Sequence, residues 1–168
     1  DSAENLAAII HDVQPDLVIN AAGLASVQGC EDDRENAMRA NAELPARIAQ
    51  GCRNEGVKFV HISTDHLFGG DVPCRSEDDA VDPLNQYAVS KYEGEQAVSS
   101  IDETALVIRT NFFGWGPSYR QSISDMIISS LRKSEPITMF EDVFFTPIYI
   151  ARLVQAIHQL VALGGTGI

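Results

Sequence analysis

Residues 57–65, Val-Lys-Phe-Val-His-Ile-Ser-Thr-Asp, decide the fold of this chain. Their apolar run ends in two hydroxyl residues and a carboxylate. This pattern is typical of a strand that is buried in a parallel sheet and presents polar groups at its carboxyl end. Two similar runs stand before and after it. We therefore expect buried strands over 16–22, 57–62 and 105–110.

Segments with helical periodicity alternate with these strands. They predict helices over about 2–13, 31–55 and 87–100, and two more marked by residues 123–131 and 150–161. Pro45 predicts a kink or a restart within the second helix, and Gly56 its end. Strands alternating with helices indicate an α/β chain with a parallel sheet.

The organisation that this pattern predicts is a Rossmann-like, doubly wound parallel sheet. A complete sheet of this kind has about six strands, and only three are found, so we expect a truncated one. Its first strands and its C-terminal substrate region would be missing. We expect a single partial domain over 1–168, in which about 111–168 lead into the substrate-binding region. The last residues, 164–168, resemble the start of a further strand.

Composition excludes some classes of function. The net charge of −12 disfavours nucleic acid, which needs a cationic surface. No apolar run approaches the length of about 20 residues that spans a membrane, and no signal peptide is visible, so a cytoplasmic protein is expected. Three cysteines without a C-x-x-C pair favour reduced thiols and no metal site. The acidic segments 31–33 and 77–79 are expected to be solvated turns.

Three residues are candidates for chemistry. Tyr87 and Lys91 are four residues apart and hence share one face of a helix. An exposed contact on a solvated helix is the alternative for this pair alone. Thr64 stands at the carboxyl end of a predicted strand, where open α/β sheets bind ligands. Ser63 is the competing hydroxyl. Because neighbouring strand residues point to opposite sides, only one of the two is expected to face the site. His61 is expected to be a strand residue with satisfied hydrogen bonds.

Longer motifs surround these residues. Residues 15–23, Pro-Asp-Leu-Val-Ile-Asn-Ala-Ala-Gly, resemble a P-D-x-V-I-N-A-A strand, and residues 61–68 are similar to H-I-S-T-D-Y-V-F. Residues 82–95 resemble P-L-N-x-Y-G-x-S-K-x-x-G-E. On these motifs the chain resembles the extended short-chain dehydrogenases/reductases, and within them the dTDP-4-dehydrorhamnose reductases.

The resemblance implies an NADPH- or NADH-dependent reductase. Its substrate would be the 4-keto group of a nucleotide-linked 6-deoxy sugar. Thr64 would hold the substrate oxygen, and Tyr87 would donate the proton. Lys91 would favour the phenolate, because a free tyrosine titrates only near pH 10.

The resemblance also implies further contacts. The cofactor would be held by Ala21, Ala22, Gly23, Tyr87 and Lys91, although the three small residues are equally consistent with tight helix–sheet packing. The sugar would be contacted by Asp65, His66 and Phe112. His66 stands where the family usually has tyrosine, and Phe112 stands where it has tryptophan and is equally consistent with a core role. Asn41 is expected to support the backbone near the site.

Several alternatives remain open from sequence. A nucleotide-sugar epimerase or dehydratase of the same superfamily would use the same Tyr–Lys pair, and a non-catalytic regulatory relative would keep only the fold. The chain is expected to be a fragment; a naturally short relative that forms a homodimer is the alternative. No G-x-x-G-x-x-G motif for a pyrophosphate is present. We therefore expect weak dinucleotide binding by residues 1–168.

Overall fold

The structure is a computed structural model that describes residues 3–70, 72–116, 121–139 and 145–168. The chain divides into two compact units. The first comprises residues 1–109 and 165–168, and the second comprises residues 110–164. The division falls next to residue 111, where the substrate-binding region is expected to begin.

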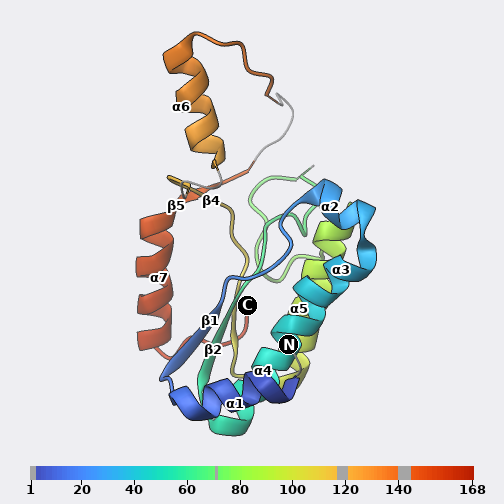
Figure 1. The fold of residues 1–168 in the computed structure, drawn as a ribbon, viewed down its shortest axis with the longest axis vertical. Helices are drawn as coiled ribbons and strands as arrows, with labels where there is room; N and C mark the ends of the chain where they lie inside the picture. Colours follow the sequence, from blue (N-terminus) through green and yellow to red (C-terminus); the bar gives the residue numbers. More distant parts are fainter. Residues whose placement is uncertain (1–2, 71, 117–120, 140–144) are drawn as a thin grey trace. The chain divides into compact units, whose positions relative to one another are not determined.

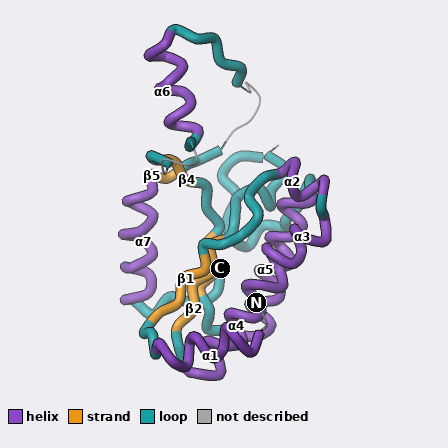
Figure 2. Tube along the Cα trace, in the orientation of Figure 1, coloured by secondary structure: helices purple, strands orange, loops and turns teal. Residues whose placement is uncertain are grey.

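The first unit holds the parallel sheet and most of the helices (Figures 1 and 2). Its elements are α1 (Ala3–Val13), β1 (Leu17–Asn20), α2 (Val27–Asp32), α3 (Arg34–Met38), the π-helical turn η1 (Arg39–Glu43), α4 (Leu44–Glu55), β2 (Lys58–Ile62), α5 (Gln86–Ile101) and β3 (Leu106–Ile108).

The sheet confirms the three expected strands. Their order is β1-β2-β3, and both pairings are parallel. The register places Asn20 opposite His61, and Val60 opposite Leu106. Beyond β3, Gly167 forms a parallel bridge with Leu106, so the C-terminal residues run alongside the sheet as a further strand would.

The helical segment expected over 31–55 is divided. It begins earlier, at Val27, and passes through α2, α3 and η1 before α4 starts. Pro45 lies in the first turn of α4, directly after the π-helical turn η1, so the helix changes type at the point where a kink or a restart was expected. Gly56 ends α4 with a left-handed φ of 67°, as expected.

The core of the first unit lies between the sheet and one layer of helices. Figure 1 shows α1, α4 and α5 on one side of β1 and β2. Phe59, Val98 and Val107 are at most 2% exposed and pack together with Ala49 and Ile10. Each buried valine or phenylalanine contributes about 1.5–3 kcal/mol. This packing holds the carboxyl end of β2 against α5.

The second unit consists of two short parallel strands and two helices: β4 (Phe112–Phe113), α6 (Ile123–Lys133), β5 (Ile148–Tyr149) and α7 (Ile150–Ala162). Ser122 and Asp125 form a capping box at the start of α6. Both helices were expected from their periodicity. The strands were not, because two residues are too few to show alternation.

Two observations bear on the composition. Cys30 and Cys52 are buried, Cys74 is exposed, and all three are free thiols. Within the described ranges, no helix has the length and apolar character needed to cross a membrane.

Candidate functional site

The candidate site lies at the carboxyl end of β2, in the first unit. Ser63 and Thr64 follow the last strand residue, Ile62, and are 5% and 4% exposed. The Ser63 N–H donates to the Ile108 carbonyl over 2.8 Å, which keeps this segment beside the end of β3. Two hydroxyl groups are therefore fixed at the sheet edge where parallel α/β folds bind ligands.

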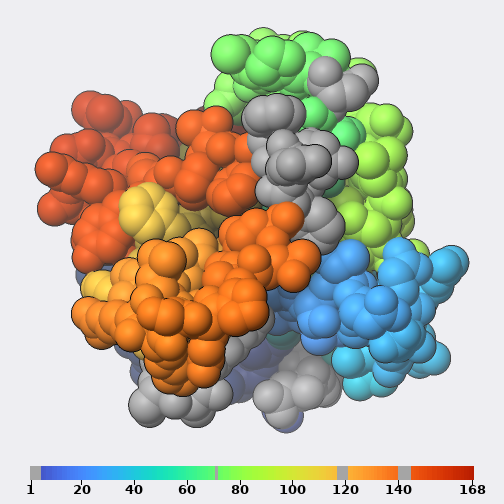
Figure 3. Space-filling model, turned by 90° about the horizontal axis from the view of Figure 1, so that it is seen from above, coloured from blue at the N-terminus to red at the C-terminus, as the bar shows by residue number. Residues whose placement is uncertain are grey.

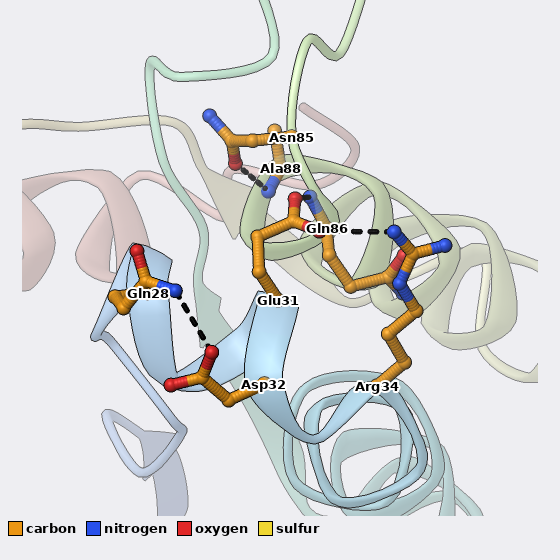
Figure 4. Close-up of polar contacts among 7 residues, drawn as sticks. All are labelled: Gln28, Glu31, Asp32, Arg34, Asn85, Gln86 and Ala88. Atoms are coloured by element: carbon orange, nitrogen blue, oxygen red, sulfur yellow. Dashed lines mark hydrogen bonds and ion pairs between the residues drawn. The ribbon is translucent and has the colours of Figure 1, made fainter.

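Helix α5 carries the other two candidate residues, and its first turn is held by side chains (Figure 4). Asn85 caps the helix by accepting from the Ala88 N–H over 2.9 Å. The Glu31 carboxylate, from α2, accepts from the Gln86 N–H over 2.7 Å and is paired with Arg34. Each contact satisfies a backbone donor that the helix itself cannot satisfy.

This arrangement differs from the solvated acidic turn expected over 31–33. Glu31 is half-buried and fixes α5, and Asp33 caps α3 by accepting from the Asn36 N–H. Asp32 is exposed and accepts from Gln28 over 2.8 Å. On the face shown in Figure 3, both the light blue atoms of α2–α3 and the yellow-green atoms of α5 reach the surface. The sequence pattern could not distinguish a capping carboxylate from its solvated neighbours.

Thr64 and Tyr87 are linked through His66. Thr64 Oγ1 accepts from the His66 N–H over 3.2 Å, and the His66 ring meets the Tyr87 ring edge-on, with centroids 5.6 Å apart. Of the two hydroxyl residues after β2, Thr64 is the one that acts on the pKa of the tyrosine. Ser63 Oγ is buried and has no hydrogen-bond partner among the described residues.

Tyr87 is held in its protonated form. Burial raises the pKa of the phenol above its ordinary value of 10.0, and the Thr64 hydroxyl opposes this shift only in part. The nearby Asp65 carboxylate raises the pKa further. Lys91 is not among the groups that shift the pKa of Tyr87, so the lowering expected from it is not seen in the chain's own contacts.

Lys91 is buried, with 5% exposure. Its Nζ donates to the Ile62 carbonyl over 2.6 Å and lies 3.5 Å from His61 Nε2. Burial lowers the pKa of Lys91 to about 8, and Glu95 opposes this shift. The lysine is thereby tied to the end of the strand that carries Thr64.

The remaining cofactor candidates follow β1. Ala21, Ala22 and Gly23 are exposed, so packing between helix and sheet does not explain the two alanines. The Ala22 N–H donates to Asn20 Oδ1 over 3.1 Å. A Cβ on Gly23 would lie 2.7 Å from Asn41 Oδ1, so a larger residue would have to displace the Asn41 amide.

The sugar candidates belong to both units of the chain. Asp65 follows Thr64, and its buried Oδ1 has no hydrogen-bond partner among the described residues. His66 is exposed beside Tyr87. Phe112 belongs to β4 in the second unit and is 49% exposed, so a core role does not account for it. The functional roles of all three stay predictions.

Asn41 supports the backbone, in line with expectation. Within η1 it is 1% exposed. Its Oδ1 accepts from the Leu24 N–H over 2.8 Å, and its Nδ2 donates to the Leu24 carbonyl and to Ser90 Oγ. Asn41 therefore links the loop after β1 to α5.

Sequence reasoning missed two groups near the site. Asn20 Nδ2 lies 3.1 Å from His61 Nδ1, and His61 in turn faces Lys91. Glu95 and Arg109 form an ion pair of 2.8 Å, with their side chains 0% and 9% exposed. Asn20 and His61 both stand at the ends of predicted adjacent strands, and this alignment could have predicted their contact.

A protonated phenol, a hydroxyl group and a buried amine lie near the carboxyl edge of a parallel sheet. These are groups suited to acid–base chemistry on an oxygen atom. Within the described residues, no group of three or more His, Cys, Asp or Glu side chains could hold a metal ion. A parallel α/β chain with this set has the architecture of a short-chain dehydrogenase/reductase.

Comparison with known proteins assigns the chain to a family. The model of the family described as RmlD substrate binding domain matches residues 1–164. The chain belongs to this family.

Individual relatives agree with this assignment. The chain is 33% identical to the dTDP-4-dehydrorhamnose reductase of Mycolicibacterium smegmatis, over 87% of this chain and 45% of that protein. It is 30% identical to the probable low-salt glycan biosynthesis reductase Agl14 of Haloferax volcanii, over 98% and 56%. The chain thus spans about half the length of the curated relatives it matches.

A solved structure supports the fold. The dTDP-4-dehydrorhamnose reductase of Bacillus anthracis, determined in complex with NADP, superimposes with a TM-score of 0.87 at 28% identity. The match covers 96% of this chain and 57% of that chain. The expected Rossmann-like parallel α/β fold and the predicted family resemblance are therefore confirmed, and the partial coverage is consistent with the expected truncation.

Proposed function

We propose that this chain carries the acid–base residues of a reductase that converts the 4-keto group of a nucleotide-linked 6-deoxy sugar into an alcohol with NADPH or NADH. The observation that carries this proposal is the meeting of three candidate residues at the end of β2. Thr64 is linked to Tyr87 through His66, and Lys91, one turn further along α5, donates to the Ile62 carbonyl. The similarity to dTDP-4-dehydrorhamnose reductases supports the substrate class, and the NADP complex of a related structure supports the cofactor.

The residues present fit a dinucleotide. Ala21, Ala22 and Gly23 are exposed and small, so a flat ring could approach the backbone after β1. Tyr87 and Lys91 would contact the dinucleotide with their polar groups. The reduced dinucleotide would supply the hydride for the ketone carbon.

The chain's own residues would provide the proton and the orientation. Tyr87 would donate its phenolic proton to the ketone oxygen, and its raised pKa keeps that proton in place at neutral pH. Thr64 would hydrogen-bond the same oxygen and hold it for attack. Asp65, His66 and Phe112 are proposed as sugar contacts.

Turnover by the intact protein tests the proposal. NADPH oxidation with a dTDP-4-keto-6-deoxyhexose is expected to fall about 10²–10⁴-fold in kcat in Tyr87→Phe, because the proton donor is lost. Tyr92→Phe, on the same helix, is the matched control and is expected to keep wild-type kcat. Full activity in Tyr87→Phe would show that the catalytic assignment is wrong.

Two other outcomes identify the alternatives. Epimerisation with a retained cofactor and no net NADPH oxidation indicates an epimerase, and a folded wild type without any turnover indicates a regulatory relative. A cytoplasmic location, a homodimer and weak dinucleotide binding by residues 1–168 also stay predictions. Calorimetry that finds micromolar NADPH affinity for residues 1–168 would contradict the last of these.

A further inference from the structure

A line of three buried polar residues crosses the sheet to α5. Asn20 ends β1, His61 lies opposite it on β2, and Lys91 faces His61 from the helix. The three residues are 4%, 0% and 5% exposed. Most polar atoms at such burial are matched to a donor or an acceptor within the protein, because an unmatched one is costly.

The Asn20 amide has one orientation that satisfies its neighbours. Its Oδ1 accepts from the Ala22 N–H over 3.1 Å, so Nδ2 is the atom that lies 3.1 Å from His61 Nδ1. The reverse orientation would set the amide nitrogen against the Ala22 donor. Since an amide nitrogen only donates, His61 Nδ1 must offer its lone pair. In a neutral imidazole the proton is then on Nε2.

The protonated Nε2 faces a second donor. Lys91 Nζ lies 3.5 Å from it and donates to the Ile62 carbonyl over 2.6 Å. A lysine ammonium has three donors and no acceptor, whereas the neutral amine has a lone pair that can accept the imidazole N–H. The contact therefore disfavours the charged lysine.

We infer that His61 is a positioning residue that sets the pH range in which Lys91 changes charge, because Asn20 turns an N–H of the imidazole toward the lysine amine. As a role in catalysis, this inference rests on the proposed function. Glu95 on α5 is a charged group that acts on Lys91, and its carboxylate is held by Arg109 from the end of β3.

Two titration properties support the geometry. Burial and Lys91 lower the pKa of His61 to about 3, so the imidazole stays neutral where the lysine titrates. Burial lowers the pKa of Lys91 to about 8. Burial alone could produce the second shift, and the experiment below separates it from the effect of the histidine.

Nitrogen-15 spectra of the wild-type histidine ring test the first step without any variant. We expect Nε2 to carry the proton, Nδ1 to be bare, and the ring to stay neutral down to about pH 5. A proton on Nδ1, or titration near the ordinary value of 6.5, would overturn the inference. Asn20→Asp keeps the acceptor for Ala22 and offers a second oxygen to the ring, so it is expected to move the proton to Nδ1.

The second step is tested by the Lys91 titration, followed through its ¹³Cε signal, which is assigned by its loss in Lys91→Arg. We expect His61→Phe to raise the pKa of Lys91 by about one unit, because the opposing donor is gone while an aromatic ring still fills the position. An unchanged or lower pKa would show that burial alone sets it. His11→Phe, at an exposed position on α1, is the control and should leave the Lys91 titration unchanged.

The pH dependence of kcat connects this test to catalysis. If the inference holds, the limb that reports Lys91 moves in His61→Phe by the same amount as the NMR titration. A protein that shows the expected NMR shift but no turnover contradicts the proposed function alone. An active protein whose Lys91 titration does not respond to His61→Phe contradicts the inference alone.

Discussion

Lys91, on α5, and Arg109, which binds α5 from the end of β3, are basic side chains with little exposure. Their hydrogen-bond partners differ. Arg109 donates through Nε and Nη2 to Glu95 over 2.8–3.2 Å and through Nη1 to the Glu77 carbonyl over 3.1 Å. Lys91 meets one carbonyl and one imidazole N–H. Among the described residues, no carboxylate lies within ion-pair distance of Lys91.

This difference in partners gives Arg109 a structural role and leaves Lys91 able to change its charge. A buried charge with a matched partner is a structural group, because changing its protonation would strand the partner. A buried amine without a counter-ion keeps a low pKa and can change its charge near neutral pH. One helix turn thus carries a fixed ion pair and a titratable base.

The largest effect is expected from breaking the fixed pair. Glu95→Gln leaves the Arg109 guanidinium buried without its counter-charge, and we expect the free energy of unfolding to fall by about 3–5 kcal/mol. Urea denaturation measures this change. Glu43→Gln removes an exposed pair with Arg47 and should cost less than about 1 kcal/mol. Equal losses in Glu95→Gln and Glu43→Gln would show that the Glu95–Arg109 pair stabilises the protein no more than an exposed pair does.

A smaller loss of stability is expected from a substitution at Gly94, which stands between Lys91 and Glu95 in α5. A Cβ at this position would lie 2.1 Å from the Asn41 carbonyl oxygen, so α5 must move away from η1. We expect Gly94→Ala to destabilise the protein by about 1–3 kcal/mol in thermal or urea unfolding. Glu93→Ala, at an exposed neighbouring position, should stay within about 0.5 kcal/mol of wild type. A stable Gly94→Ala would mean that the close approach of α5 is not required.

The smallest effect is expected at the start of the helix. Glu31→Ala leaves the Gln86 N–H without its acceptor, and we expect a loss of about 1 kcal/mol. Because Tyr87 is the next residue, kcat should also fall, by less than in Tyr87→Phe. Asp32→Ala, which removes the contact with Gln28, is the control for both measurements. If the two variants behave alike, Glu31 does not position α5.

Much of the first unit could be predicted from sequence. The three strands, the restart at Pro45 and the end of α4 at Gly56 follow from local patterns, since burial and backbone preference act within a few residues. Thr64, Tyr87 and Lys91 could be selected because strand ends and helical spacing place them on one edge. The shorter strands β4 and β5 lie below the length at which a pattern is visible.

The sequence by itself determined the parallel α/β class through its periodicity, and it carried the family resemblance and the residue types available for proton transfer through its motifs. Only the tertiary structure decided which side chains are partners. It placed Asn20 behind His61, His61 against Lys91, and Glu31 on the first turn of α5. Those contacts join residues 30 to 55 positions apart. They depend on strand register and helix packing, and no local pattern specifies either.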